Sequence, residues 1–221
     1  MSRLAGPPWR ARPPWRGGNQ YVRRPGRLPA VRAGRDSQET LEEAKRLAVS
    51  PFVGYLLGAA RDLRWQVRYE TALNRYCPSS ALGPLAGDGD QRVRAAAAGN
   101  PNCPVALLPQ LAADRGGSVR LAVALRPDCP AGLLDRLGQD RSTKVRWAAL
   151  SNKNFCSPEA LAAASASSNR SIRLAAADNQ GCPPAVLERL LRDRVDVVVQ
   201  AAAANPSLPR AALAMWQLIQ R

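Results

Sequence analysis

Histidine is absent from the 221 residues, and this absence removes several kinds of chemistry. Ser-His-Asp and Cys-His catalysis, histidine-ligated zinc sites and the usual proton carrier near neutral pH all need an imidazole. We therefore expect a protein that is not an enzyme. Aromatic residues are also few, 5% of the chain, whereas 39 residues are alanine. Such a composition predicts a core built from helices that pack closely over small side chains.

Long apolar stretches are missing as well. The chain has no run of about 18 apolar residues, which excludes a membrane-spanning helix. Its N-terminus lacks the apolar stretch of about 7–15 residues that marks a secretory signal. We therefore expect a cytoplasmic protein.

Positive charge is concentrated at the N-terminus. Of the net charge of +15, residues 1–35 carry +9, from nine arginines and no acidic residue, and residues 36–221 carry +6, from 23 basic and 17 acidic residues. Proline and glycine are frequent in residues 1–35, and apolar residues show no periodicity there. The composition predicts a disordered Arg/Pro/Gly-rich tail.

The tail contains the motif Pro-Pro-Trp-Arg twice, and its candidate contact residues are Trp9, Arg10, Trp15 and Arg16. Arginine neutralises phosphates and tryptophan stacks on unpaired bases, which favours nucleic acid as a partner. An acidic protein or membrane surface would attract the same charges. A tail that only improves solubility is the third interpretation, and the sequence leaves all three open.

A repeat of 26 residues decides the fold class. Its first column recurs at steps of 26, 26, 26, 27 and 26 residues: Val67-Arg68, Val93-Arg94, Val119-Arg120, Val145-Arg146, Ile172-Arg173 and Val198-Val199. Asparagine (once Arg126) follows seven residues later, then a cysteine column, then two columns of mostly leucine. We place the extra residue of the fifth unit between Asn152 and Cys156. The register predicts seven repeats, starting near residues 41, 67, 93, 119, 145, 172 and 198, in a domain that spans residues 36–221.

Each repeat is predicted to form two short helices. The first, such as 93–100, is rich in alanine and ends at asparagine and proline. The second, such as 104–114, begins at the Cys-Pro step, with cysteine as N-cap and proline as first helical residue. Neither helix is long enough to be stable alone in water, so the repeats must stack. Asp36 and Glu39 predict a capping pair for an opening helix. At the other end, an apolar group either folds back over the last unit or forms a contact surface: Met215, Trp216, Leu218 and Ile219.

The cysteines fall in a single column: Cys77, Cys103, Cys129, Cys156 and Cys182. Adjacent helical layers are about 8–10 Å apart, whereas disulfide partners need Cα atoms within about 7 Å. One metal ion or cluster cannot gather ligands from so long a row. We expect five free thiols that serve as small cap side chains, in a reducing compartment, without a metal or cofactor.

The arginine column is the principal candidate site: Arg68, Arg94, Arg120, Arg146 and Arg173. One arginine per layer would form a basic stripe that follows a phosphate backbone or contacts a protein partner. However, an acidic column precedes the arginine column by six residues in all but one unit: Asp62, Asp88, Asp114, Asp140 and Asp193. The second interpretation is therefore a ladder of Asp–Arg pairs between repeats.

The combined pattern of Asp, Val-Arg, Ala-rich helix, Asn and a Pro-led Leu-x-x-Leu segment resembles the leucine-rich repeat variant family, which is similar to HEAT-type helical repeats. The resemblance covers about residues 41–221. It implies a right-handed α-solenoid of paired short helices, one of which can be 3₁₀-like, without a β-sheet. Some members carry an N-terminal cysteine cluster for a [4Fe–4S] centre. We do not expect that cluster here, because no cysteine precedes Cys77.

Solenoids offer extended surfaces that suit macromolecular partners. We therefore predict a non-catalytic scaffold for protein–protein interaction, whose partner the sequence does not identify. The alternative is nucleic-acid binding by the tail and the arginine column together.

The register can be tested by deletion. Removing residues 93–118 deletes one whole period, so the flanking repeats should restack and the chain should melt cooperatively. Removing residues 93–105 deletes half a period and brings unlike helices together, so we expect a much lower Tm in a circular-dichroism melt. Equal Tm values for the two deletions would contradict the register.

Overall fold

The computed structural model describes residues 42, 52–155 and 157–219. All described residues belong to the unit Asp36–Arg221. The predicted tail, with Trp9, Arg10, Trp15 and Arg16, lies outside the described residues, and so does the capping pair Asp36 and Glu39.

Between residues 52 and 219 the described elements are all helices. In chain order they are α2 (Val53–Ala59), α3 (Trp65–Leu73), α4 (Ser79–Ala86), α5 (Gln91–Gly99), η2 (Val105–Leu107), α6 (Leu108–Ala112), α7 (Gly117–Ala124), α8 (Ala131–Leu137), α9 (Thr143–Leu150), α10 (Pro158–Ser165), α11 (Arg170–Asp178), α12 (Pro184–Leu190), α13 (Asp196–Ala204) and α14 (Arg210–Ile219). The 3₁₀ helix η2 opens the second helix of the third repeat. No helix of this part of the chain has both the length and the apolarity needed to cross a membrane.

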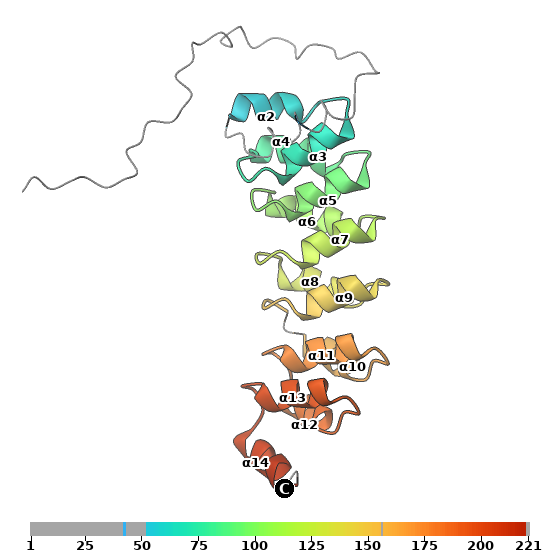
Figure 1. Ribbon diagram of the computed structural model, residues 1–221, viewed down its shortest axis with the longest axis vertical. Coiled ribbons are helices and arrows are strands. Elements are labelled where there is room, and N and C mark those ends of the chain that lie inside the picture. Colours follow the sequence, from blue (N-terminus) through green and yellow to red (C-terminus); the bar gives the residue numbers. More distant parts are fainter. Residues whose placement is uncertain (1–41, 43–51, 156, 220–221) are drawn as a thin grey trace, which may run out of the picture. The chain divides into compact units, whose positions relative to one another are not determined.

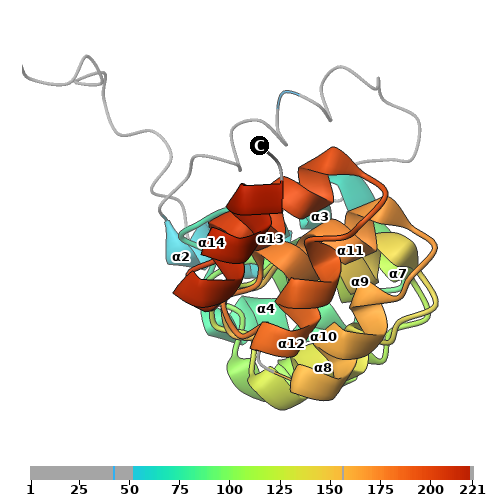
Figure 2. The same cartoon turned by 90° about the horizontal axis from the view of Figure 1, so that it is seen from below.

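The helices form a solenoid in which each repeat contributes one helix to each of two rows. The first helices α3, α5, α7, α9, α11 and α13 pack on one another in that order (Figure 1). The second helices α4, α8, α10 and α12 lie on the other side, as the view along the stack shows (Figure 2). The all-α solenoid of two-helix repeats predicted from the sequence is therefore confirmed.

The repeated apolar columns form the core between the two rows. The valine column is at most 2% exposed in every repeat from Val67 to Val198. The first leucine column is completely buried from Leu82 to Leu187. Burial of one such side chain contributes about 1.5–3 kcal/mol. Because no helix between residues 52 and 219 exceeds ten residues, this burial against the neighbouring repeats stabilises helices that would be marginal alone.

The second helices begin one residue later than the sequence predicted. In α4, α8 and α12 the N-cap is the proline itself (Pro78, Pro130 and Pro183), and its side chain makes no cap hydrogen bond. The preceding cysteines are core side chains, no more than 2% exposed. The prediction that cysteine acts as the N-cap is therefore wrong, because the apolar thiol is used for packing between layers.

The asparagine column joins the turns of adjacent repeats. The Nδ2 of Asn100 donates to the carbonyl oxygens of Ala72 (2.7 Å) and Asn74 (2.8 Å) in the preceding repeat, while its Oδ1 accepts from the backbone N–H of Asn102. Asn152 and Asn205 repeat this pattern. In the fourth repeat Arg126 replaces asparagine and donates to the equivalent carbonyl oxygens. These bonds satisfy carbonyl groups at the C-terminal ends of the first helices.

The fifth repeat departs from the others. The backbone N–H of each column cysteine donates to the carbonyl oxygen of the asparagine column, and in the fifth repeat Phe155 makes this bond, to Asn152 at 2.9 Å. Phe155 is 1% exposed. The extra residue therefore falls between Phe155 and the N-cap Ser157, and not before Cys156 as the sequence predicted. Cys156 itself lies outside the described residues.

The apolar group at the C-terminus divides between the two predicted roles. Trp216 on α14 is half-buried against the core. In contrast, Met215, Leu218 and Ile219 are exposed by 65%, 69% and 78%. Only Trp216 of this group therefore covers the last repeat.

The phenylalanine in the cysteine column depends on a glycine in the preceding repeat. A Cβ on Gly138 would lie 2.8 Å from Cε2 of Phe155. We expect Gly138→Ala to lower the free energy of unfolding by about 1–3 kcal/mol, as overpacking of a core does, and Phe155→Leu to restore part of this loss. The measurement is urea denaturation.

Gly132→Ala in α8 is the matched control, because no atom lies within 4 Å of its added Cβ. It should leave stability unchanged or raise it by up to about 1 kcal/mol. Equal effects of the two substitutions would contradict the packing described here.

Candidate functional site: the arginine column

Each arginine of the column is the fourth residue of a first helix and follows a buried valine or isoleucine. The valine side chain packs into the core, so the next residue lies at the edge of the layer, where the helix meets the turn that precedes it. Arg94, Arg120 and Arg173 are buried, whereas Arg68 and Arg146 are half-buried.

Arg120 shows how the column is bonded. Its Nε donates to Oδ2 of Asp140 at 2.6 Å and its Nη2 donates to Oδ1 at 3.0 Å, which makes a bidentate ion pair. Its Nη1 donates to the carbonyl oxygens of Asp114 (2.7 Å) and Arg115 (3.2 Å) in the turn before its own helix. Four of the five guanidinium N–H groups therefore have acceptors.

The same bonds recur in the second, third and sixth repeats. Arg68 pairs with Asp88, Arg94 with Asp114 and Arg173 with Asp193. Asp–Arg pairs thus recur in four repeats, but the predicted pairing between repeats is wrong, because each of these pairs joins two residues of the same repeat. Each carboxylate pairs with the arginine 20 residues before it, whereas the aspartate six residues before an arginine offers that arginine only its backbone carbonyl oxygen.

Each ladder aspartate also begins the next repeat. Oδ1 of Asp140 accepts from the backbone N–H of Ser142 at 2.7 Å, and Asp114 and Asp193 bond in the same way two residues ahead. The hydrogen bond from Arg120 lowers the pKa of Asp140 from its ordinary value, and those from Arg94 and Arg173 lower the pKa of Asp114 and Asp193. All three carboxylates are therefore charged near neutral pH.

The ladder changes the role of the column. Paired side chains of this kind have few donors left for a phosphate or a partner, which argues against the basic stripe at Arg68, Arg94, Arg120 and Arg173. Arg146 is the exception. It keeps the bonds to two carbonyl oxygens, Asp140 at 2.8 Å and Arg141 at 3.3 Å, and forms no ion pair with any described residue.

The four described column cysteines are free, buried thiols. Burial raises the pKa of Cys77, Cys129 and Cys182 to about 11, so they are protonated near neutral pH and poor nucleophiles. Within the part of the chain that the structure describes, no three His, Cys, Asp or Glu residues are arranged to hold a metal ion.

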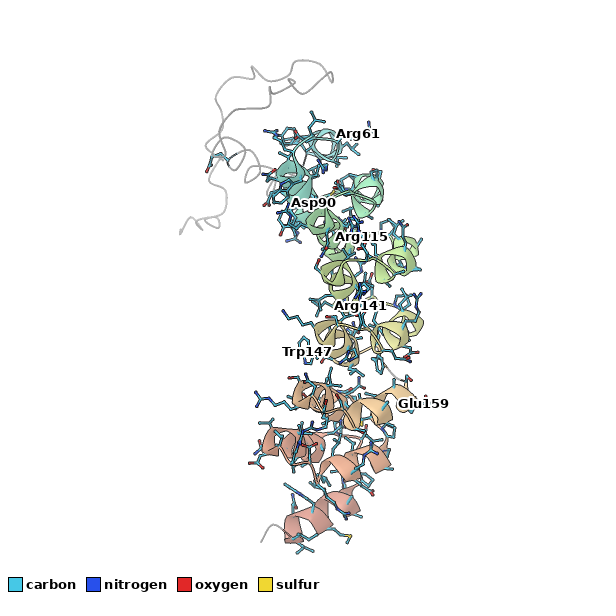
Figure 3. The ribbon with its side chains drawn as sticks, turned by 90° about the vertical axis from the view of Figure 1, so that its right-hand side faces the viewer. Arg61, Asp90, Arg115, Arg141, Trp147 and Glu159 are labelled. Atoms are coloured by element: carbon cyan, nitrogen blue, oxygen red, sulfur yellow. The ribbon has the colours of Figure 1, made fainter. Side chains whose placement is uncertain are left out.

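A surface that the sequence reasoning did not single out lies along the outer side of the first helices. We call it the first-helix face, and its apolar members are Tyr69, Leu73, Leu121, Leu125, Trp147 and Leu174. Trp147 is 43% exposed and Leu125 is 57% exposed, and Trp147 lies at the side of the stack (Figure 3). The sequence contains a signal for this face, because all six residues stand either two or six positions after the buried valine or isoleucine of their repeat.

The comparisons with known proteins agree with this geometry. The family model described as leucine rich repeat variant matches residues 92–116 and 118–142. A solved structure described as a leucine-rich repeat variant with a novel repetitive protein structural motif is similar over 80% of this chain and 75% of its own, with 26% sequence identity and a TM-score of 0.56. Comparison with curated protein sequences gives no match. The resemblance to the leucine-rich repeat variant family is therefore confirmed.

The ladder can be tested at one of its most buried steps, the pair Arg120–Asp140. Asp140→Asn leaves the guanidinium of Arg120 buried without a counter-charge, so we expect the free energy of unfolding to fall by about 3 kcal/mol in urea denaturation. Glu188→Gln is the control, because Glu188 is exposed and takes part in none of the ion pairs of the described residues. It should change stability by less than about 0.5 kcal/mol.

The pH dependence of the same variants tests the charge of the carboxylate. Because the folded-state pKa of Asp140 lies below the unfolded value of about 3.9, its pairing contributes stability above the unfolded pKa and loses it as the pH falls through the folded pKa. The difference in stability between wild type and Asp140→Asn should therefore narrow below about pH 4. A difference that stays constant would argue against an ionised pair.

Proposed function

We propose that this chain, whose repeats are of the leucine-rich repeat variant type, is a non-catalytic scaffold that binds a protein partner through the first-helix face. The observation that carries the proposal is a row of apolar and aromatic side chains that the core leaves partly exposed. The repeat fold supports a role in interaction in general, and the choice of this face is our inference from its composition.

The composition of the face fits the centre of a protein interface. Such centres are rich in aromatic residues and poor in charge, and they are surrounded by polar residues. Trp147 and Leu125 supply apolar area that is exposed by about half. Lys144 and Arg170 are exposed at the beginnings of neighbouring first helices. Because successive first helices pack on one another, these side chains lie on one continuous surface.

The charges of the ladder do not supply a competing surface. In the four complete steps, each arginine is neutralised by an aspartate that is fixed by its own backbone hydrogen bond. The nucleic-acid alternative therefore depends on the tail of residues 1–35 and on the exposed arginines. The experiment below distinguishes nucleic-acid binding from binding of a protein partner.

The proposal extends to chemistry and location. A protein without an imidazole, in which the described thiols are protonated by burial, fits a binding role better than a catalytic one. Free thiols fit a reducing compartment, so localisation in the cytoplasm stays our prediction.

The test is capture of partners by the immobilised full chain from a nuclease-treated extract of the native cell. We expect Trp147→Ala to weaken partner binding about tenfold or more, since aromatic residues dominate interface energies, without changing the Tm. Tyr76→Ala is the matched control, because Tyr76 is an equally exposed aromatic residue (50%) in the turn between α3 and α4. It should leave binding unchanged.

The opposite result is also defined. Binding to duplex or single-stranded DNA that falls steeply between about 50 and 200 mM salt, that is lost on deletion of residues 1–35 and that is unaffected by Trp147→Ala would support nucleic-acid binding in place of the scaffold.

A further inference from the structure

The fifth repeat holds its arginine in the same position as the other repeats. Nη1 of Arg146 donates to the carbonyl oxygens of Asp140 at 2.8 Å and Arg141 at 3.3 Å. The equivalent bonds of Arg120 measure 2.7 and 3.2 Å. The guanidinium of Arg146 is therefore seated by its backbone contacts in the orientation that presents Nε and Nη2 to a carboxylate in the other repeats.

The carboxylate of this step is missing from the sequence, because Ser167 stands where the other repeats have aspartate. Ser167 keeps the two structural bonds of that position. Its Oγ accepts from the backbone N–H of Asn169 at 3.2 Å, and its carbonyl oxygen accepts from Nη1 of Arg173 at 2.9 Å. It therefore starts the next helix as an aspartate would, but its side chain is too short and uncharged to pair with Arg146. Instead, Nη2 of Arg146 donates only to Oγ1 of Thr143, at 3.2 Å.

A hollow of about 560 Å³ lies over this step. Its polar lining comes from Gln139, Arg146, Ser157, Glu159 and Ser167, and small residues of α10 such as Ala163 add apolar lining. The corresponding hollow in the third repeat, about 450 Å³, is lined by both the arginine and its aspartate, Arg94 and Asp114. In the fifth repeat the arginine thus faces open space that is large enough for a side chain of another molecule.

We propose that Arg146 and this hollow form a binding site for a carboxylate, namely an aspartate or glutamate side chain of a protein partner that completes the ladder in place of the residue at position 167. Arginine binds carboxylates in a bidentate manner, and the fork is held in place before binding, so little conformational freedom is lost. The proposal rests on the proposed scaffold function, because it gives the chemistry of the partner at one site.

The other charged group of the hollow sets its selectivity. Glu159 is exposed, and its Oε2 is 3.4 Å from Oγ of Ser157. A carboxylate beside an arginine repels a second anion, so the site should accept a singly charged carboxylate more readily than the more highly charged phosphate. Removal of the charge by Glu159→Gln should strengthen binding of a carboxylate several-fold.

The experiment uses the full chain with ¹⁵N-labelled arginine and follows the Nε–H resonance of Arg146 by NMR. The probe is N-acetyl-aspartate N-methylamide, and the neutral N-acetyl-asparagine N-methylamide is its control. We expect a saturable shift of the Arg146 resonance with the aspartate probe and none with the control. The resonances of Arg94, Arg120 and Arg173 should stay in place, because aspartates already occupy their forks.

Substitution at position 167 provides the decisive pair of variants. Ser167→Asp should close the ladder within the chain, raise the Tm and reduce the response of Arg146 to the probe at least tenfold. Ser167→Asn introduces a side chain of the same size as aspartate but without the charge, so the Arg146 resonance should still respond to the probe. Arg146→Lys keeps the charge but lacks the fork and the observed resonance, so its binding is measured by calorimetric titration with the aspartate probe, beside the wild type. It should lose the binding, which keeps the test valid if Ser167→Asp does not fold.

Three results would overturn the site: no response to the aspartate probe, an equal response at the exposed Arg141, or a stronger response to inorganic phosphate. These outcomes are separate from the scaffold test. Partner binding that depends on Trp147 would survive the loss of this site, and probe binding at Arg146 would survive the failure of partner capture.

Discussion

The length of the helices is the constraint on which the rest of the structure depends. None of the described helices exceeds ten residues, and helices of this size are marginal in water unless they bury one face against a neighbour. The buried columns from Val67 to Val198 and from Leu82 to Leu187 supply that burial once per repeat. The alanines of the first helices let adjacent layers approach closely. Position in the repeat therefore decides the role of a residue, for polar side chains as much as for apolar ones.

The two polar columns fix how one repeat sits on the next. Asparagine side chains donate hydrogen bonds to carbonyl oxygens at the C-terminal ends of the preceding first helices, where the helix itself supplies no donor. The bidentate Arg–Asp pairs join the beginning of one first helix to the turn before the next. A shift of register would leave a buried guanidinium without its carboxylate, which costs far more than an exposed pair would lose. The ladder thus specifies the register, and it also neutralises four of the five column arginines that suggested a nucleic-acid surface.

The fifth repeat concentrates the departures from the pattern. Phe155 replaces a cysteine in the core and requires Gly138 in the preceding repeat to lack a Cβ. One residue is inserted before Ser157, and Ser167 replaces the ladder aspartate. These changes leave Arg146 facing a hollow, and the next residue on the same helix is the exposed Trp147. A function specific to this chain is therefore best sought at this repeat, where its residues differ from the structural pattern of the others.

The sequence by itself determined the fold class, the 26-residue register and the core columns, because each depends on residues that recur at fixed spacing along the chain. It offered an Asp–Arg ladder only as one of two interpretations of the arginine column. It did not determine which aspartate each arginine pairs with. Asp114 is six residues from Arg120 and 20 from Arg94 along the chain, but its carboxylate pairs with Arg94, and Arg120 contacts only its backbone carbonyl oxygen. It placed Cys156 in the cysteine column, where the structure has Phe155, because an inserted residue shifts the register without marking its own place. It treated five arginines as equivalent, although only the packing of the layers distinguishes four closed ion pairs from the open fork of Arg146. Spacing along the chain records what each repeat shares, whereas distances between layers decide which side chains are satisfied and which remain available to a partner.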